Sequence, residues 1–251
     1  MLVMGILNVT PDSFADGGKH NDFEAAVARG LEMIAEGVDI IDIGGESTRP
    51  GAERVSEEEE IARTIPVINE LAKHGKPISI DTMRSRTAEA AIKAGASIIN
   101  DVSGGLADPE MLQTAARLKV PYIAMHWRGQ SKDMNSKAIY NDVVSDVISE
   151  LNERIEAALD AGIEKDKLMI DPGIGFAKEA EHNWAIIDSI DRFVAMGYPV
   201  LVGASRKRFL GGDSPDQREQ ATIDLTKRLG TTGVWAVRVH SVKPHKEVLS
   251  S

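Results

Sequence analysis

The sequence predicts a single-domain (β/α)8 TIM barrel over residues 1–251, and three observations carry this prediction. Eight short apolar runs alternate with eight helical or partly helical stretches along the whole chain. The runs are apolar throughout, which is typical of a parallel sheet that is covered on both faces. No linker, low-complexity tract or long polar insertion divides the chain, and 251 residues suit one α/β barrel.

The predicted strands are short apolar runs that end at polar residues, glycine or proline. They cover Val3–Val9, Asp39–Gly45, Pro77–Asp81, Ser97–Val102, Tyr122–His126, Leu168–Asp171, Val200–Ser205 and Trp235–His240. The loops after the first two strands, Thr10–Asn21 and Glu46–Val55, are rich in glycine, proline and polar residues, and we expect them to be mobile lids.

The predicted helices follow from helical periodicity, capping residues and terminal glycines. They cover Phe23–Gly37, Ser56–His74, Arg84–Ala94, a segment starting near Asp108, Lys137–Ala161, Glu179–Met196, about Pro215 to Leu229, and a short segment from about Pro244. Ser56 is the expected cap of its helix, and Glu57–Glu60 occupy the first turn. Acids at this position offset the helix dipole, so we expect them to face solvent.

Composition excludes several classes of function. The chain has 29 basic and 39 acidic residues, for a net charge of −10, which argues against a general binder of nucleic acid or anionic membranes. It has no cysteine, which excludes disulfides and thiolate metal sites. No apolar run approaches the roughly 20 residues of a membrane span, and no signal sequence is recognisable. The expectation is a soluble, cytoplasmic protein.

Polar side chains stand at the carboxyl ends of the predicted strands, where an α/β barrel carries its active site. In chain order they are Asn8, Asp42, Asp81, Asn100 with Asp101, His126, Asp171, Ser205, and Arg238 with His240. Chance would not place polar groups at the same end of eight successive apolar runs. The sequence therefore predicts one polar site built from all the strand ends.

Two of these ends indicate the kind of ligand. Asp171 is followed by Pro172, Gly173 and Gly175, which leave the backbone open beside a carboxylate that needs hydrogen-bond donors. A 2-amino-4-oxo-pyrimidine edge, as in guanine or a pterin, offers two parallel N–H donors. The seventh end, GASRKRFLGG at residues 203–212, gathers three cations. Together with Arg238 and His240 on one face of the last strand, it is a candidate phosphate or pyrophosphate site.

Other motifs are absent. Gly173 and Gly175 begin a G-x-G-x-x-G match, but Lys178 stands where the third glycine belongs. There is also no phosphate-binding G-x-x-x-x-G-K-[ST] loop, no zinc-type histidine spacing and no G-x-S-x-G elbow. A divalent ion can still bind through Asn8 and the phosphates of a substrate, because Mg²⁺ often uses few protein ligands.

The chain resembles the dihydropteroate synthase family of pterin-binding barrels. The matching stretches run in the family's order from residue 4 to residue 240. They are MGILNVTPDSFADGG (4–18), IDIGGESTRPG (41–51), SIDTMR (79–84), IINDVSGG (98–105), MH (125–126), DPGIGF (171–176), GASRKRF (203–209) and VRVH (237–240). No single stretch is specific, but the ensemble is.

The resemblance implies roles for individual residues. A deep pterin pocket would consist of Asp81, Asn100, Met125, Asp171, Phe176, Lys207 and Arg238. The pyrophosphate would be surrounded by Asn8, Arg49, Ser205, Arg238 and His240. The p-aminobenzoate site would be formed by Phe14, Thr48, Arg49, Pro50, Lys207 and Arg208. Asn8 would also hold Mg²⁺, and the groups expected to act in catalysis are Lys207, Arg238, His240 and Asn8.

The implied reaction joins 6-hydroxymethyl-7,8-dihydropterin pyrophosphate to p-aminobenzoate and releases pyrophosphate. The resemblance also implies a homodimer formed through barrel helices. Two positions depart from the usual pattern of the family: Arg208 stands where many members have serine, and Ser241 replaces an aspartate that often follows the histidine of the last strand. The Gly230–Gly233 turn, GTTG, is also unusual.

Two other functions remain open on the sequence. A methyltetrahydrofolate–corrinoid methyltransferase on the same barrel would keep Asp81, Asn100 and Asp171 but has no use for the phosphate-binding cations. A pterin-binding paralogue without catalysis would bind the pterin and form no product. Binding of pyrophosphate distinguishes the first alternative, and turnover with the complete set of substrates distinguishes the second.

Overall fold

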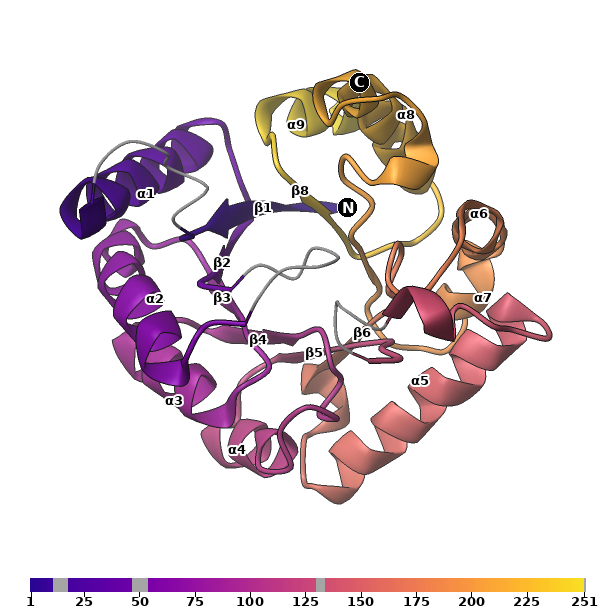
Figure 1. Cartoon of the computed structure of the whole chain (residues 1–251), viewed down its shortest axis with the longest axis horizontal. Helices are drawn as coiled ribbons and strands as arrows, with labels where there is room; N and C mark the ends of the chain where they lie inside the picture. The colour runs from indigo at the N-terminus through magenta and orange to yellow at the C-terminus, as the bar shows by residue number, and fades with distance from the viewer. Residues whose placement is uncertain (11–17, 47–53, 130–133, 251) are drawn as a thin grey trace.

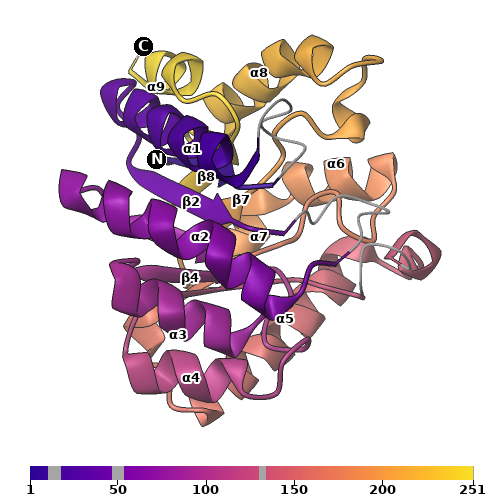
Figure 2. The same ribbon diagram turned by 60° about the vertical axis from the view of Figure 1, so that its left-hand side comes forward.

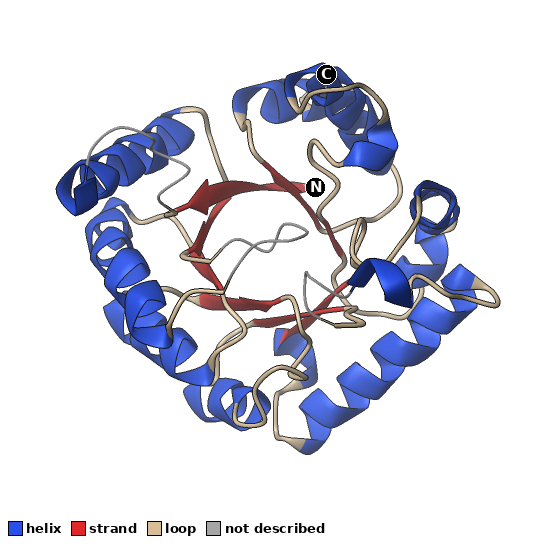
Figure 3. Cartoon of the chain, viewed as in Figure 1, coloured by secondary structure: helices blue, strands red, loops and turns tan. Residues whose placement is uncertain are grey.

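A ring of parallel strands lies at the centre of the molecule and helices surround it (Figures 1 and 3). The structure is a computed structural model that describes residues 1–10, 18–46, 54–129 and 134–250. The strands are β1 (Leu2–Asn8), β2 (Ile40–Gly44), β3 (Ile78–Asp81), β4 (Ile98–Asp101), β5 (Tyr122–Met125), β6 (Leu168–Asp171), β7 (Leu201–Val202) and β8 (Ala236–Val239). Each falls within or overlaps a strand predicted from the sequence.

The sheet closes on itself. Its order is β6-β5-β4-β3-β2-β1-β8-β7, and every pair in it is parallel. β6 and β7 complete the ring through a parallel bridge between Ile170 and Val200, where the Ile170 N–H donates to the Pro199 carbonyl at 3.0 Å. The predicted (β/α)8 barrel is confirmed.

Helices cover the outside of the ring, and α1 to α4 lie side by side in chain order (Figure 2). The α-helices are α1 (Gly18–Ala35), α2 (Glu57–Leu71), α3 (Ser85–Ala94), α4 (Met111–Leu118), α5 (Val143–Asp160), α6 (Ala180–Asp188), α7 (Ile190–Val194), α8 (Glu219–Leu229) and α9 (Lys243–Leu249). Short 3₁₀ helices are η2 (Ala72–His74), η3 (Met134–Lys137), η4 (Lys165–Lys167), η5 (Arg208–Leu210) and η6 (Asp216–Arg218). No helix among these is long and apolar enough to cross a membrane.

Two helix predictions need correction. The helix predicted over Lys137–Ala161 begins at Val143, because the Asp142 carboxylate caps it by accepting from the Ser145 N–H at 2.8 Å. The helix predicted over Glu179–Met196 divides at Ser189 into α6 and α7.

An apolar layer, here named the apolar plug, fills the barrel interior. It consists of one residue each from seven strands: Met4, Ile40, Ile98, Ile123, Met169, Leu201 and Ala236. The residues that directly follow these positions on the same strands, such as Ile41, Ile99 and Ile170, face outward and belong to a separate core shared with the surrounding helices. Because side chains alternate along a strand, residues two positions beyond the apolar layer also face inward, closer to the carboxyl ends of the strands.

The acidic first turn of α2 differs from prediction at one residue. Ser56 caps the helix as expected, with its Oγ accepting from the Glu59 N–H at 3.1 Å. Glu60 does not face solvent: its side chain is 1% exposed. It forms an ion pair with Arg84 and accepts from the Thr87 hydroxyl at 3.1 Å. The periodicity of the helix turns this fourth acid toward α3, where it needs a cation.

We expect Glu60→Ala to lower the free energy of unfolding by about 2 kcal/mol, because it removes the more buried of the two carboxylates that pair with Arg84, the other being Glu46. Glu57→Ala in the same turn is the matched control. It removes an ion pair to Arg86, whose side chain is 68% exposed, and should cost less than about 1 kcal/mol. Urea denaturation measures both, and equal losses would contradict a structural role for the buried pair.

Candidate active site at the barrel mouth

The layer above the apolar plug is mostly polar. Its members lie two residues beyond those of the plug, and β3 contributes Asp81, which is level with Asn100 in the sheet register. They are Ile6, Asp42, Asp81, Asn100, Met125, Asp171, Gly203 and Arg238. The strand periodicity thus brings together acids, an amide and a cation that are up to 196 residues apart in the sequence.

Arg238 is the centre of this layer. Its Nε donates to Asp42 Oδ2 at 2.6 Å, and its Nη2 donates to Asp81 Oδ2 at 2.7 Å. Asn100 joins the same group, because its Nδ2 donates to Asp42 Oδ2 at 3.2 Å. Asp42 is fully buried, whereas the Arg238 side chain remains 18% exposed. The cluster is therefore closed below and accessible from the mouth.

The loop after β6 forms the next part of the rim. The Asp171 carboxylate accepts from the Gly173 N–H at 2.7 Å, which folds the chain back at the strand end. The Lys207 ammonium donates to the Ile174 carbonyl and lies 4.4 Å from the centre of the Phe176 ring. The basic turn after β7 thus reaches the loop after β6 through one lysine.

A gap in the layer lies at β7, because Gly203 carries no side chain. A Cβ built there would lie 3.9 Å from both Arg238 Cβ and Asp171 Oδ2. The missing side chain leaves space between the Asp171 carboxylate and the base of the Arg238 side chain. Two residues further out on β7 and β8, the Ser205 hydroxyl and His240 Nδ1 are 2.9 Å apart, and the His240 N–H donates to the same hydroxyl at 3.2 Å.

Burial shifts the ionisation of the cluster. It raises the pKa of Asp81 to about 7, with Arg238 opposing the change. Burial also raises the pKa of Asp171, although the Gly173 N–H and Lys207 stabilise its charge. Burial lowers the pKa of Lys207 to about 8, against the pull of Asp171. The ion pairs with Asp42 and Asp81 outweigh burial at Arg238 and raise its pKa, so it stays charged.

Three groups expected at the shared site lie elsewhere. Asp101 follows inward-facing Asn100, so it faces the helices, where it accepts from the Tyr122 hydroxyl at 2.7 Å. His126 follows inward-facing Met125 and pairs with Glu150 on α5 at 2.9 Å. Arg206 turns toward α8 and binds Glu219 at 2.6 Å. The convergence predicted from strand ends therefore holds for alternate residues only.

The remaining predicted residues are distributed as follows. Phe14, Thr48, Arg49 and Pro50, together with most of the two predicted lid loops, lie outside the described residues. Arg208 is exposed at the start of η5, a single 3₁₀ turn rather than a longer helix. Asn8 ends β1 on its inward-facing side. Asp42 is among the predicted strand ends but has no predicted role. The inward orientation that it shares with Arg238 was the signal that could have predicted their contact.

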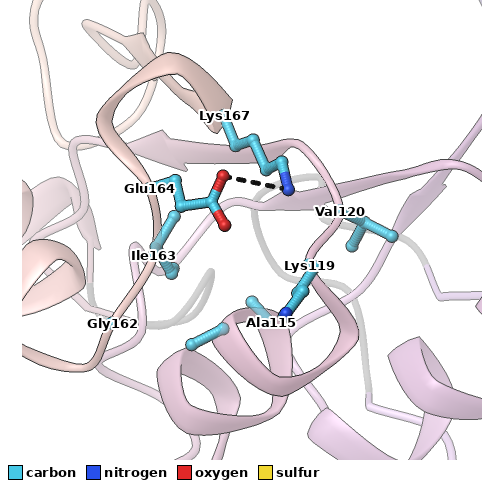
Figure 4. Close-up of a pocket in the computed structure, with 8 residues that line it drawn as sticks. Ala115, Lys119, Val120, Gly162, Ile163, Glu164 and Lys167 are labelled. Carbon is cyan, nitrogen blue, oxygen red and sulfur yellow. Dashed lines mark ion pairs between the residues drawn. The ribbon is translucent and has the colours of Figure 1, made fainter.

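Two observations bear on metals and other pockets. Within the described ranges, no three His, Cys, Asp or Glu side chains form a group that could hold a metal ion by themselves. A recess between the segments that lead into β5 and β6 is lined by Lys119, Val120, Glu164 and Lys167 (Figure 4). It lies at the amino-terminal ends of these strands, opposite the polar layer, and belongs to a different end of the barrel.

Comparisons with known proteins agree with this geometry. Residues 4–240 match the family model described as "Pterin binding enzyme". The chain is 47% identical over 257 residues to the dihydropteroate synthase of Mycobacterium leprae, covering 98% of this chain and 90% of the relative.

Solved structures of relatives are also similar. Dihydropteroate synthase from Xanthomonas albilineans with 4-aminobenzoic acid superposes with a TM-score of 0.93 at 45% identity, covering 99% of this chain and 90% of that one. The same enzyme in complex with 7,8-dihydropteroate gives a TM-score of 0.90 at 42% identity, covering 99% and 91%.

Proposed function

Since this chain belongs to the dihydropteroate synthase family of pterin-binding enzymes, we propose that its barrel mouth joins 6-hydroxymethyl-7,8-dihydropterin pyrophosphate to p-aminobenzoate. The enzyme is a transferase of folate biosynthesis. The observation that carries the proposed site is the gathering of Asp81, Asn100, Asp171, Lys207 and Arg238 on one inner rim. The ligands named for the Xanthomonas structures correspond to one substrate and the product of this reaction.

The polar groups of the rim complement a pterin. Its 2-amino-4-oxo edge carries parallel N–H donors, and the carboxylates of Asp81 and Asp171 would accept hydrogen bonds from them. The Asn100 amide can both donate and accept, so it suits a heterocycle that has a carbonyl beside its N–H groups. Lys207 would donate to the acceptor side of the ring. Buried carboxylates need such donors, because their own desolvation is costly.

The walls of the proposed pterin pocket are flat or apolar. Met125 lies level with Asp171 in the sheet register and is 3% exposed. Phe176 is partly buried on the loop after β6. Arg238 would stack on the ring, since its guanidinium is held in place from the side by Asp42 and Asp81. The absence of a side chain at Gly203 leaves space for the ring beside these groups.

The pyrophosphate would lie above the pterin, at the outer rim. Ser205 and His240 already contact one another there and offer a hydroxyl and a ring nitrogen. Arg238 supplies positive charge from below. We include Asn8 and Arg49 in the same subsite on the family resemblance, although Arg49 lies outside the described residues.

Mg²⁺ fits this subsite only in combination with the substrate. The described residues offer no all-protein cage, and Asn8 supplies one amide oxygen at the inward end of β1. Mg²⁺ prefers oxygen ligands and commonly combines few protein groups with substrate phosphates and water. When bound, it would neutralise part of the charge on the pyrophosphate.

The p-aminobenzoate site is proposed from the resemblance and from the residues that border it. Lys207 lies on the rim and Arg208 is exposed beside it, so two cations are available near a carboxylate substrate. The other proposed members lie on the two lid loops: Phe14, Thr48, Arg49 and Pro50.

The chemistry needs stabilisation of charge more than proton transfer. The C–O bond between the pterin methylene and pyrophosphate breaks, the aryl amine forms the new C–N bond, and its proton passes to solvent. Arg238, His240 and Ser205 would stabilise the departing negative charge through preorganised contacts. The aryl amine is neutral near pH 7, so no strong general base is required.

We also propose that the enzyme is a homodimer through barrel helices, as the resemblance implies. Trp184 on α6 is 38% exposed, and its ring lies edge-on to the Phe209 ring with 5.4 Å between the centroids. This exposed aromatic pair supports α6 as part of the dimer surface. Light scattering tests the proposal: a mass near 54 kDa, twice the 27.1 kDa of one chain, is expected, and 27.1 kDa would contradict it.

The central test of the function is turnover. Purified protein given both substrates and Mg²⁺ should release pyrophosphate and form 7,8-dihydropteroate. We expect Arg238→Gln to lower kcat about a hundredfold, because it removes a preorganised cation from the leaving group. Arg228→Gln is the control, since this arginine is 49% exposed and pairs with Asp188 at the surface. No turnover by the unaltered enzyme would favour the non-catalytic pterin-binding alternative.

The pH dependence of kcat/KM for the pterin substrate should be bell-shaped. Below about 7, protonation of Asp81 removes an acceptor for the pterin N–H groups, so the rate falls as the pH decreases. Above about 8, Lys207 loses its proton and its charge, so the rate falls again as the pH increases.

Lys207→Arg should move the alkaline limb of the profile to higher pH, because a guanidinium keeps its proton. Rates followed from roughly pH 6 to pH 9 measure both limbs. A profile that stays flat over this range, or an alkaline limb unchanged in the arginine variant, would contradict these assignments.

A further inference from the structure

Lys178 and His126 have no place in the proposed reaction, yet they lie directly behind the pterin site. Lys178 follows the loop after β6, and His126 follows β5 on the outward-facing side. The Lys178 Nζ lies 2.9 Å from His126 Nδ1. It also donates to the carbonyls of Gly173 and Phe176, both at 3.1 Å. Burial lowers the pKa of Lys178 to about 7, and in the protonated form the three N–H bonds of the amine match these three acceptors.

The two carbonyls belong to the loop that shapes the pterin site. This loop is held from its inner side by Lys207, which donates to the Ile174 carbonyl. From its outer side, the Tyr140 hydroxyl donates to the Ala177 carbonyl at 2.9 Å. Lys178 supplies the two bonds between these anchors. The backbone of the loop is strained as well, since Ala177 has a positive φ of 48°.

The loop has little freedom to move toward β5. A Cβ at Gly173 would lie 2.4 Å from the His126 carbonyl, and the residue has a φ of 69°. The close approach of the two backbones therefore places His126 within reach of Lys178. Without the amine, the Gly173 and Phe176 carbonyls would lose side-chain donors in a confined space.

A chain of charges anchors the amine to the outer helices. His126 Nε2 lies 2.9 Å from Glu150 Oε2. Arg128 Nε donates to the same oxygen at 3.0 Å, and its guanidinium lies 3.9 Å from the centre of the Tyr140 ring. Burial and the neighbouring Lys178 lower the pKa of His126 to about 4, so the ring is neutral. The lysine is thereby connected to α5 through a neutral ring, which adds no further positive charge.

We propose that Lys178 is a positioning residue for the pterin site: by holding the Gly173 and Phe176 carbonyls, it fixes the loop that orients Asp171 through the Gly173 N–H and carries the Phe176 ring. This inference rests on the proposed function of the barrel mouth. It predicts a larger effect on the pterin than on p-aminobenzoate, because the other residues assigned to p-aminobenzoate follow different strands and only Lys207 contacts this loop.

Lys178→Met tests the proposal, because it keeps an unbranched side chain and removes the amine. We expect KM for the pterin pyrophosphate to rise about tenfold, which corresponds to the net loss of about one hydrogen bond that holds the loop. KM for p-aminobenzoate should change less than about twofold, well under the 1.4 kcal/mol of a tenfold effect. The Kd for 6-hydroxymethylpterin, measured by calorimetry, should rise in parallel.

Chemical rescue separates positioning from general damage. The chain has no cysteine, so Lys178→Cys can be alkylated with bromoethylamine in denaturant at one position and then refolded. The product restores an amine at nearly the original length. We expect it to return the pterin KM to within about twofold of the unaltered enzyme taken through the same treatment. Lys178→Gln, with two donors on a shorter side chain, should be intermediate and serves if the methionine variant does not fold.

Glu150→Gln is the matched control. It removes the charge that pairs with Arg128 but keeps an oxygen that accepts from His126 Nε2, at a residue that does not contact the loop, so it should lower stability and leave the pterin KM unchanged. Turnover by the unaltered enzyme establishes the proposed function separately. Against that background, an unchanged pterin KM in folded Lys178→Met, failure of the amine to rescue, or an equal rise in both KM values would overturn the positioning role.

Discussion

The two ion pairs of Arg238 are the interaction on which the rest of the barrel mouth depends. A guanidinium inside a barrel is costly to desolvate, and it is stabilised here because Asp42 accepts from its Nε and Asp81 accepts from its Nη2. The same pairs separate two carboxylates that would otherwise repel one another. With Asp171 and Lys207 included, the cluster holds three acids and two cations, so it favours a ligand edge rich in N–H donors.

The apolar plug below makes this arrangement possible. It fills the barrel below the polar layer with side chains such as Ile98 and Met169, so the polar layer lies against apolar groups on its inner side. Electrostatic contacts in such a place are stronger than at the surface. The cost appears in the ionisation of the groups: burial moves the pKa of Asp81 up to about 7 and that of Lys207 down to about 8.

Much of this was predictable from the sequence, because strand periodicity and strand ends are local properties. All eight strands and the inward positions of Asp81, Asn100 and Asp171 follow from apolar runs that stop at polar residues. The prediction that both Asn100 and Asp101 face the site was wrong for Asp101, because neighbours on a strand face opposite sides. Applying the alternation from Met125 would also have sent His126 outward.

Other features required coordinates, because they depend on contacts between distant segments. In the sequence, Lys178 is notable only because it replaces the third glycine of a G-x-G-x-x-G motif. In the structure, its amine donates to two carbonyls of the loop after β6. Glu60 looked like one of four solvent-facing acids, and its pairing with Arg84 depends on how α2 packs on α3. The pairing of Asp42 with Arg238 joins two ends of the chain that only the closed barrel brings together.

The most direct measurement is a crystal structure of the protein with a bound pterin. The ring should lie above the apolar plug, with its N–H edge within hydrogen-bonding distance of Asp81 and Asp171 and one face against Arg238. A pterin bound outside the barrel mouth, or one whose N–H edge points away from both carboxylates, would contradict the proposed site.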